Sequence, residues 1–106
     1  MRAQMSWEGE SIEAREGVFF FDPEDPIYAD HFPGHPVVPG SVIVHAFMVA
    51  GRGLQDPLSA WSIENFRFRR FVSPGEYSYR IEVAGGRLRC ALRDGPSLVA
   101  TGTLKL

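Results

Sequence analysis

The run over residues 42–50 constrains the fold most, because it is apolar at every position except His45. Pro39-Gly40-Ser41 precedes the run and two glycines follow it closely, which is typical of the start and the end of a helix. A helix that is apolar all round must be buried all round. In a chain of 106 residues only a curling sheet can enclose it. We therefore predict a helix over residues 41–54, wrapped by such a sheet.

The last third of the chain alternates between apolar and polar residues. Three alternating segments lie within residues 77–106, and Gly85-Gly86 and Asp94-Gly95-Pro96 separate them. Alternation with a period of two predicts strands that have one solvated face, and the glycine-containing breaks predict turns. Together they predict an antiparallel meander. A further strand is predicted over residues 61–72.

The N-terminal third combines strand-like and loop-like segments. Residues 11–14 and 18–21 are strand-like, and Arg15-Glu16-Gly17 between them is compatible with one bulged strand or with a hairpin. Five prolines and two glycines over residues 22–40 exclude a regular helix or a central strand, so an ordered loop is predicted there. We find no linker and predict a single domain over residues 1–106.

Cysteine content and charge narrow the function classes. One cysteine cannot form an intrachain disulfide, and no apolar signal-like stretch begins the chain, so a cytoplasmic setting without a membrane span is predicted. Residues 1–30 carry two basic and eight acidic side chains, whereas residues 57–106 carry eight basic and four acidic ones. The basic part suits an acidic partner. The net charge of −2 disfavours nucleic acid, despite interleaved Arg and Phe over residues 66–71.

Residues 30–40 read Asp-His-Phe-Pro-Gly-His-Pro-Val-Val-Pro-Gly, and residues 68–76 read Phe-Arg-Arg-Phe-Val-Ser-Pro-Gly-Glu. The first segment, with the helix after it, resembles the signature of the 3-hydroxyacyl-thioester dehydratases of fatty-acid synthesis, and the second resembles a weaker segment of that family. The resemblance implies the α+β hotdog fold, in which a curved antiparallel sheet wraps around one central α-helix, and it implies paired subunits. It also implies a hydro-lyase that converts a 3-hydroxyacyl thioester, linked to acyl carrier protein or coenzyme A, into the trans-2-enoyl product.

The resemblance assigns roles to individual residues. His31 matches the catalytic histidine, the general base that removes the proton alpha to the thioester carbonyl. Gly40 matches the glycine whose backbone N–H binds the thioester oxygen, and an exposed amide at a helix start is suited to a developing negative charge. Phe32 and Pro39, which adjoin these two positions, are predicted to contact the substrate.

His45 departs from the family pattern. The family has a carboxylic residue fourteen positions after its histidine, where it handles the departing hydroxyl from the opposite subunit; here that position is His45. In an apolar tunnel a carboxyl group tends to keep its proton, whereas an imidazole tends to lose one. His45 is then a weak acid, or it shares a proton with His31 as a coupled pair, or it is a core histidine bound to a backbone partner.

Three functions stay open on these residues. The dehydratase is favoured over a binding module for an acyl chain or a carrier protein, in which the missing carboxylate has abolished turnover. An acyl thioesterase is the third choice, because hydrolases of this fold commonly use a carboxylate on the helix and the predicted helix contains none.

A group of arginines, a pair of histidines and the cysteine are further candidates for binding. Arg67, Arg69 and Arg70 are predicted to bind an acidic carrier protein, the alternative being a solvated strand face. No cofactor is implied and no metal is expected, because Pro33-Gly34 prevents the helix that would bring His31 and His35 onto one face. The lone cysteine, Cys90, falls on the inward side of its strand and is predicted to be a small buried hydrophobe.

Overall fold

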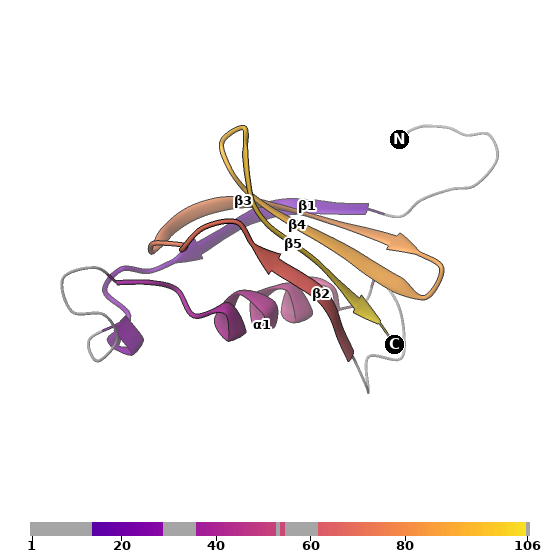
Figure 1. Ribbon diagram of the computed structural model, residues 1–106, viewed down its shortest axis with the longest axis horizontal. Helices are drawn as coiled ribbons and strands as arrows, with labels where there is room; N and C mark the ends of the chain where they lie inside the picture. The colour runs from indigo at the N-terminus through magenta and orange to yellow at the C-terminus, as the bar shows by residue number, and fades with distance from the viewer. Residues whose placement is uncertain (1–13, 29–35, 53, 55–61, 106) are drawn as a thin grey trace.

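The computed structural model describes residues 14–28, 36–52, 54 and 62–105. In chain order the elements are β1 (Ala14–Phe21), the short 3-10 helix η1 (Pro26–Tyr28), α1 (Gly40–Ala50), β2 (Ser62–Phe68), β3 (Gly75–Ala84), β4 (Arg87–Asp94) and β5 (Ser97–Lys105). The strands form a curved sheet, and α1 lies along one face of it (Figure 1). Among the described residues, no helix is long and apolar enough to span a bilayer.

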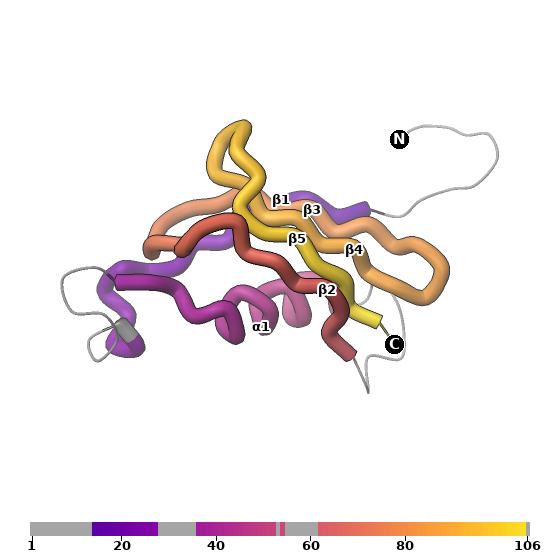
Figure 2. The backbone as a smooth tube through the Cα atoms, viewed as in Figure 1, coloured from indigo at the N-terminus to yellow at the C-terminus, as the bar shows by residue number. Residues whose placement is uncertain are grey.

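The sheet has the strand order β1-β3-β4-β5-β2, and every neighbouring pair is antiparallel. β3, β4 and β5 follow one another as predicted for the meander, and Gly85 and Gly86 make the first turn with φ of 56° and 79°, where a side chain would be strained. β1 and β2 occupy the two edges, and the chain between them carries α1 beneath the sheet (Figure 2). The helix therefore sits against the inward side chains of the central strands.

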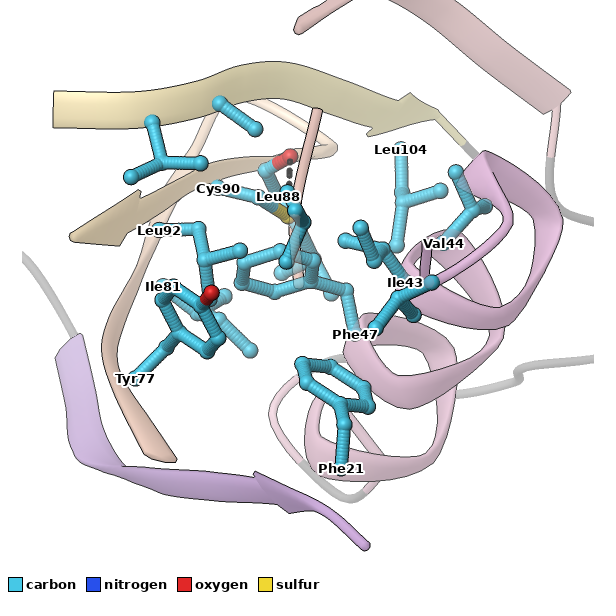
Figure 3. Packing of buried hydrophobic residues seen from close by; sticks show 14 residues of the cluster. Phe21, Ile43, Val44, Phe47, Tyr77, Ile81, Leu88, Cys90, Leu92 and Leu104 are labelled. Carbon is cyan, nitrogen blue, oxygen red and sulfur yellow. Dashed lines mark hydrogen bonds between the residues drawn. The ribbon is translucent and has the colours of Figure 1, made fainter. Parts of the chain in front are cut away.

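The core lies between α1 and the sheet. Figure 3 shows side chains from α1 and from the strands meeting in one cluster. Its fully buried members are Ile43, Phe47, Ile81, Leu88, Leu92, Val99 and Leu104. Cys90 is buried with them, as predicted. Gly102 makes room for the Phe66 ring, because a Cβ there would lie only 2.2 Å from a ring carbon.

The helix departs from its prediction in length and in burial. It ends at Ala50 rather than near residue 54: the N–H of Gly51 makes the last bond to a carbonyl four residues back, and Arg52 and Leu54 then bond to carbonyls three residues back. The prediction of burial on every side is wrong for the single chain. Ser41, His45 and Val49 are exposed, and their spacing of four places them on one stripe. Five strands cover only the opposite side of the helix.

The edge strands also differ from the pattern in the sequence. β1 runs without a break through Arg15-Glu16-Gly17, so the hairpin alternative is wrong for the described residues. β2 ends at Phe68 rather than at residue 72. Arg69 still donates its backbone N–H to the Val99 carbonyl of β5, and the chain after it leaves the sheet. There the N–H of Val38 donates to the carbonyl of Val72 at 2.7 Å. This bond ties the chain before α1 to the chain after β2.

Candidate functional site

The start of α1 presents backbone N–H groups that lie outside the helix's own hydrogen-bond pattern. Pro39 precedes the helix in an extended conformation (φ −60°, ψ 144°) and makes no side-chain cap. The first bonds to the Pro39 carbonyl come from Val42 at 3.0 Å and Ile43 at 3.3 Å. The N–H groups of Gly40 and Ser41 precede these bonds, and neither bonds to a backbone carbonyl of the described residues. Such donors, at the positive end of the helix dipole, suit an oxygen that gains negative charge.

An apolar pocket of about 250 Å³ adjoins this helix start. Its lining residues are Val37, Val38, Pro39, Gly40, Phe68, Arg70, Phe71 and Val72. The Phe68 ring lies against Gly40, since a Cβ at Gly40 would come within 3.2 Å of two ring carbons. Val38 and Val72 are buried beneath the pocket, whereas the Phe71 side chain is 80% exposed. The pocket thus combines an apolar wall with the first residue of α1.

Arg70 supplies the charged part of the pocket wall. Its Nη2 donates to Oδ2 of Asp94 at 2.7 Å, and both side chains are half-exposed. An exposed pair of this kind contributes little to stability, but it restrains where the guanidinium lies. Within the described ranges, the only carboxylate that pairs with Arg70 is that of Asp94, the last residue of β4, more than twenty residues away in sequence.

The predicted residues reach different places. Gly40 and Pro39 line the pocket. His31 and Phe32 lie outside the described residues. His45 is exposed on the open stripe of α1 and does not line the pocket; five residues from Gly40 is a rotation of about 140° around the helix axis. One chain therefore does not bring His45 to the apolar pocket.

The three predicted carrier-binding arginines do not share one surface. Arg67 lines a groove on the sheet face opposite α1, whereas Arg70 lines the apolar pocket. Arg69 follows β2 with an exposed side chain, and its backbone N–H donates to the Val99 carbonyl at 2.8 Å. The cause is the end of β2 at Phe68, after which strand alternation no longer applies.

Phe68 and Phe71 are not among the site residues that the sequence predicts. The structure places Phe68, 41% exposed, and Phe71 in the pocket wall. The available signal was the second family-like segment, residues 68–76, which begins at Phe68. The resemblance singled out residues 68–76, but it did not indicate that this segment packs against the start of α1.

The buried thiol has a clear physical state. Desolvation raises the pKa of Cys90 from 9.0 to about 12. A thiol that keeps its proton is a poor nucleophile and a poor metal ligand. Among the described residues, no three His, Cys, Asp or Glu side chains gather in a way that could hold a metal ion.

Comparison with known proteins identifies the family. The family model described as ApeI-like, ApeI dehydratase, matches residues 7–91. The chain belongs to this family. The 3-hydroxyacyl-[acyl-carrier-protein] dehydratase FabZ of Wolbachia pipientis wMel is 37% identical over 76 residues, which cover 64% of this chain and 51% of the relative. FabZ of Campylobacter curvus is 32% identical over 90 residues, covering 71% and 61%. The chain spans about half the length of the first of these relatives.

Solved structures agree with this family on the fold. The dehydratase heterocomplex ApeI:P from Xenorhabdus doucetiae superposes with a TM-score of 0.73 at 22% identity, covering 92% of this chain and 90% of that one. A point mutant of the fluoroacetyl-CoA-specific thioesterase FlK superposes with a TM-score of 0.56 at 18% identity, covering 92% and 87%. The predicted α+β hotdog fold, a curved antiparallel sheet against one central helix, is confirmed.

Proposed function

We propose that this chain dehydrates a 3-hydroxyacyl thioester to the trans-2-enoyl thioester. The observation that carries the proposal is the apolar pocket lined by Gly40, at the start of α1, in a member of a dehydratase family. The pocket is suited to an acyl chain, and the backbone amide beside it is suited to a thioester oxygen. Since the relatives are named for substrates on acyl carrier protein, we propose a carrier-linked substrate in preference to a coenzyme A thioester.

The reaction divides into a proton removal and a hydroxyl departure. The thioester oxygen accepts a hydrogen bond from the N–H of Gly40, which stabilises the enolate-like charge that develops there. His31 takes the alpha proton, the electron pair forms the new carbon–carbon double bond, and the C3–O bond breaks. The hydroxyl leaves as water after it receives a proton. His45 is the proposed donor of that proton.

The exposed stripe of α1 leads us to propose a homodimer. His45 and Val49 lie on this stripe, and Ile63, Phe68 and Phe71 are further exposed apolar side chains. A second copy placed on the stripe covers apolar surface that the five strands leave open. It also moves His45 from a solvent-exposed surface into an interface, where it serves the pocket of the partner. The proposed interface includes the loop that contains His31.

A direct assay tests the reaction. Purified protein is supplied with 3-hydroxyacyl thioesters of several chain lengths, on carrier protein and on coenzyme A, and enoyl product is measured. His31→Ala should lower the rate by about 10² to 10⁴, the contribution of a positioned general base. Ser78→Ala, an exposed change on β3 away from the apolar pocket and the stripe, is the matched control and should keep the native rate.

His45→Glu separates dehydratase from binding module. A carboxyl group that keeps its proton in an apolar tunnel donates to a departing hydroxyl better than an imidazole does, so we expect the variant to exceed the native rate by about tenfold or more. A slower variant would show that the imidazole is the working acid.

The second candidate function is a binding module, and the observation that favours it is the sequence of α1, which contains no carboxylate. If neither native protein nor His45→Glu turns over any thioester, while acyl chains or carrier protein still bind, the binding module replaces the dehydratase. Release of free acid in place of enoyl product would instead indicate the thioesterase, the third choice.

A further inference from the structure

The face of the sheet opposite α1 carries a second hollow, a shallow groove of about 630 Å³. Four arginines line it, namely Arg67, Arg80, Arg89 and Arg93. Thr101 and Thr103 contribute polar groups beside them. The groove shares no lining residue with the apolar pocket at Gly40. We call it the outer groove.

Three of the four arginines form no ion pair with a described residue, although Glu82 also lines the groove and lies opposite Arg89 in the register of β3 and β4. Arg80 is bound by Glu16 at 2.6 Å and by Glu82 at 2.8 Å, and these bonds, the one to Glu16 first, raise the pKa of Arg80. Within residues 14–28, 36–52, 54 and 62–105, no carboxylate lies within 4.0 Å of Arg67, Arg89 or Arg93. Their side chains are all exposed. The outer groove is therefore positively charged.

The strand pairing gives the approximate backbone distances between Arg67, Arg89 and Arg93. Arg67 pairs with Thr101 of β5, which pairs with Ala91 of β4, so Arg67 lies two strands, or about 10 Å, from Ala91. Arg89 and Arg93 lie two residues to either side of Ala91, about 13 Å apart. A triangle of this size is wider than one phosphate group. It matches carboxylates that are spread over the surface of a protein.

The outer groove also lies next to the candidate active site. Arg67 lines the groove, and the following residue, Phe68, lines the apolar pocket, because successive residues of a strand point to opposite faces. The chain after Phe68 then turns along the pocket wall through Arg70 and Phe71. A protein bound over Arg67 is therefore separated from the apolar pocket only by the end of β2.

We propose that the outer groove docks the acidic surface of the carrier protein that presents the thioester. This step rests on the proposed function, since a carrier-linked substrate is what brings that protein to the enzyme. Arg67, Arg89 and Arg93 bind the carrier's carboxylates. The acyl arm passes around the end of β2 to Gly40.

A binding experiment tests docking without requiring turnover. Fluorescently labelled holo acyl carrier protein is titrated with native protein and with the triple variant Arg67→Glu, Arg89→Glu, Arg93→Glu, and anisotropy gives Kd. We expect the triple variant to raise Kd by about tenfold or more at low salt, because three exposed charge pairs become repulsive. The difference should shrink in about 0.5 M salt. Arg52→Glu, an exposed change outside the groove, is the matched control and should leave Kd unchanged.

The outcomes separate docking from catalysis. A triple variant that unfolds with native cooperativity and binds the carrier with native Kd overturns the proposal. A single-stranded oligonucleotide that binds more tightly than the carrier, and loses affinity in the triple variant, also overturns it. A raised Kd with no turnover of any thioester supports docking and refutes the dehydratase. If the outer groove docks the carrier and the protein is a dehydratase, the triple variant should lower kcat/KM for the carrier-linked substrate by about tenfold, relative to kcat/KM for a short N-acetylcysteamine thioester.

Discussion

At the scale of single residues, the nearby Phe68 ring explains why position 40 is a glycine, whereas the backbone conformation does not require one. Gly40 is the first residue of α1, where alanine would ordinarily favour the helix. A Cβ would nevertheless meet the Phe68 ring at 3.2 Å, closer than most side-chain contacts. Glycine thus leaves room for the ring that forms one wall of the apolar pocket.

We expect Gly40→Ala to separate stability from activity. The melting temperature should stay near native, because gained helix propensity offsets a modest steric cost. The rate of thioester dehydration should fall by about tenfold or more, since the shifted Phe68 ring displaces the substrate from the amide. Melting curves and steady-state kinetics check both. Native kinetics in Gly40→Ala would remove this amide from the proposed site.

Cys90 should be inert in the folded protein. Burial raises the pKa of its thiol to about 12, so at pH 8 the folded state holds almost no thiolate. Labelling by iodoacetamide at pH 8 should proceed only after urea is added. Between pH 9 and pH 12 the unfolded thiol ionises while the folded one does not, so the free energy of unfolding should decrease over that range. Rapid labelling of native protein would contradict the burial.

At the scale of elements, β1 anchors the end of α1. Nη1 of Arg15 donates to the carbonyl of Ala50 at 2.7 Å and to that of Arg52 at 3.0 Å. These carbonyls belong to the last turn of α1 and the residues after it, where a cation also complements the helix dipole. A side chain from the first strand thus fixes the helix against one edge of the sheet.

Arg15→Ala should lower the free energy of unfolding by about 1 to 2 kcal/mol, because two helix-end carbonyls lose a charged, part-buried donor. Urea denaturation measures the change. Arg15→Lys should recover part of the loss, since it keeps the charge but not the forked geometry. Arg52→Ala, an exposed change beside the same turn, is the control. An Arg15→Ala protein as stable as native would show that water replaces the cap at no cost.

At the scale of the whole molecule, the sheet has one helix-covered face and one charged face. α1 is covered on the side of Ile43, Val44 and Phe47 and open along its exposed stripe. The outer groove lies on the opposite side of the sheet. A second copy on the stripe and a carrier protein on the groove would therefore use different surfaces. The predicted cytoplasmic setting stays a prediction.

We expect a dimer at micromolar concentration, with a mass by light scattering twice that of the chain. Val49→Asp should shift it towards monomer, because a charge on the stripe would be buried without a partner. Val18→Asp is the matched control: Val18 is also an exposed valine, 57% against 43% for Val49, but it lies on β1. A native monomer, or equal effects of the two variants, would contradict an interface on the stripe.

The features of this protein that depend on neighbours along the chain could be predicted from the sequence. Helix caps and apolar residues located α1, alternation and turn glycines located the β3–β5 meander, and the segments over residues 30–40 and 68–76 indicated the family. These signals are local, because hydrogen bonds within a helix and between hairpin strands join residues close in sequence.

The features that depend on distant segments emerged only in the folded chain. The exposed side of α1 follows from how far five strands reach around it, which no local pattern in the helix records. Phe68 and Phe71 became pocket walls because Val38 bonds to Val72 across more than thirty residues. Arg67 was separated from Arg70 because β2 ends between them while pairing with β5. Strand register and loop packing are set by contacts between remote residues, and those contacts exist only once the chain has folded.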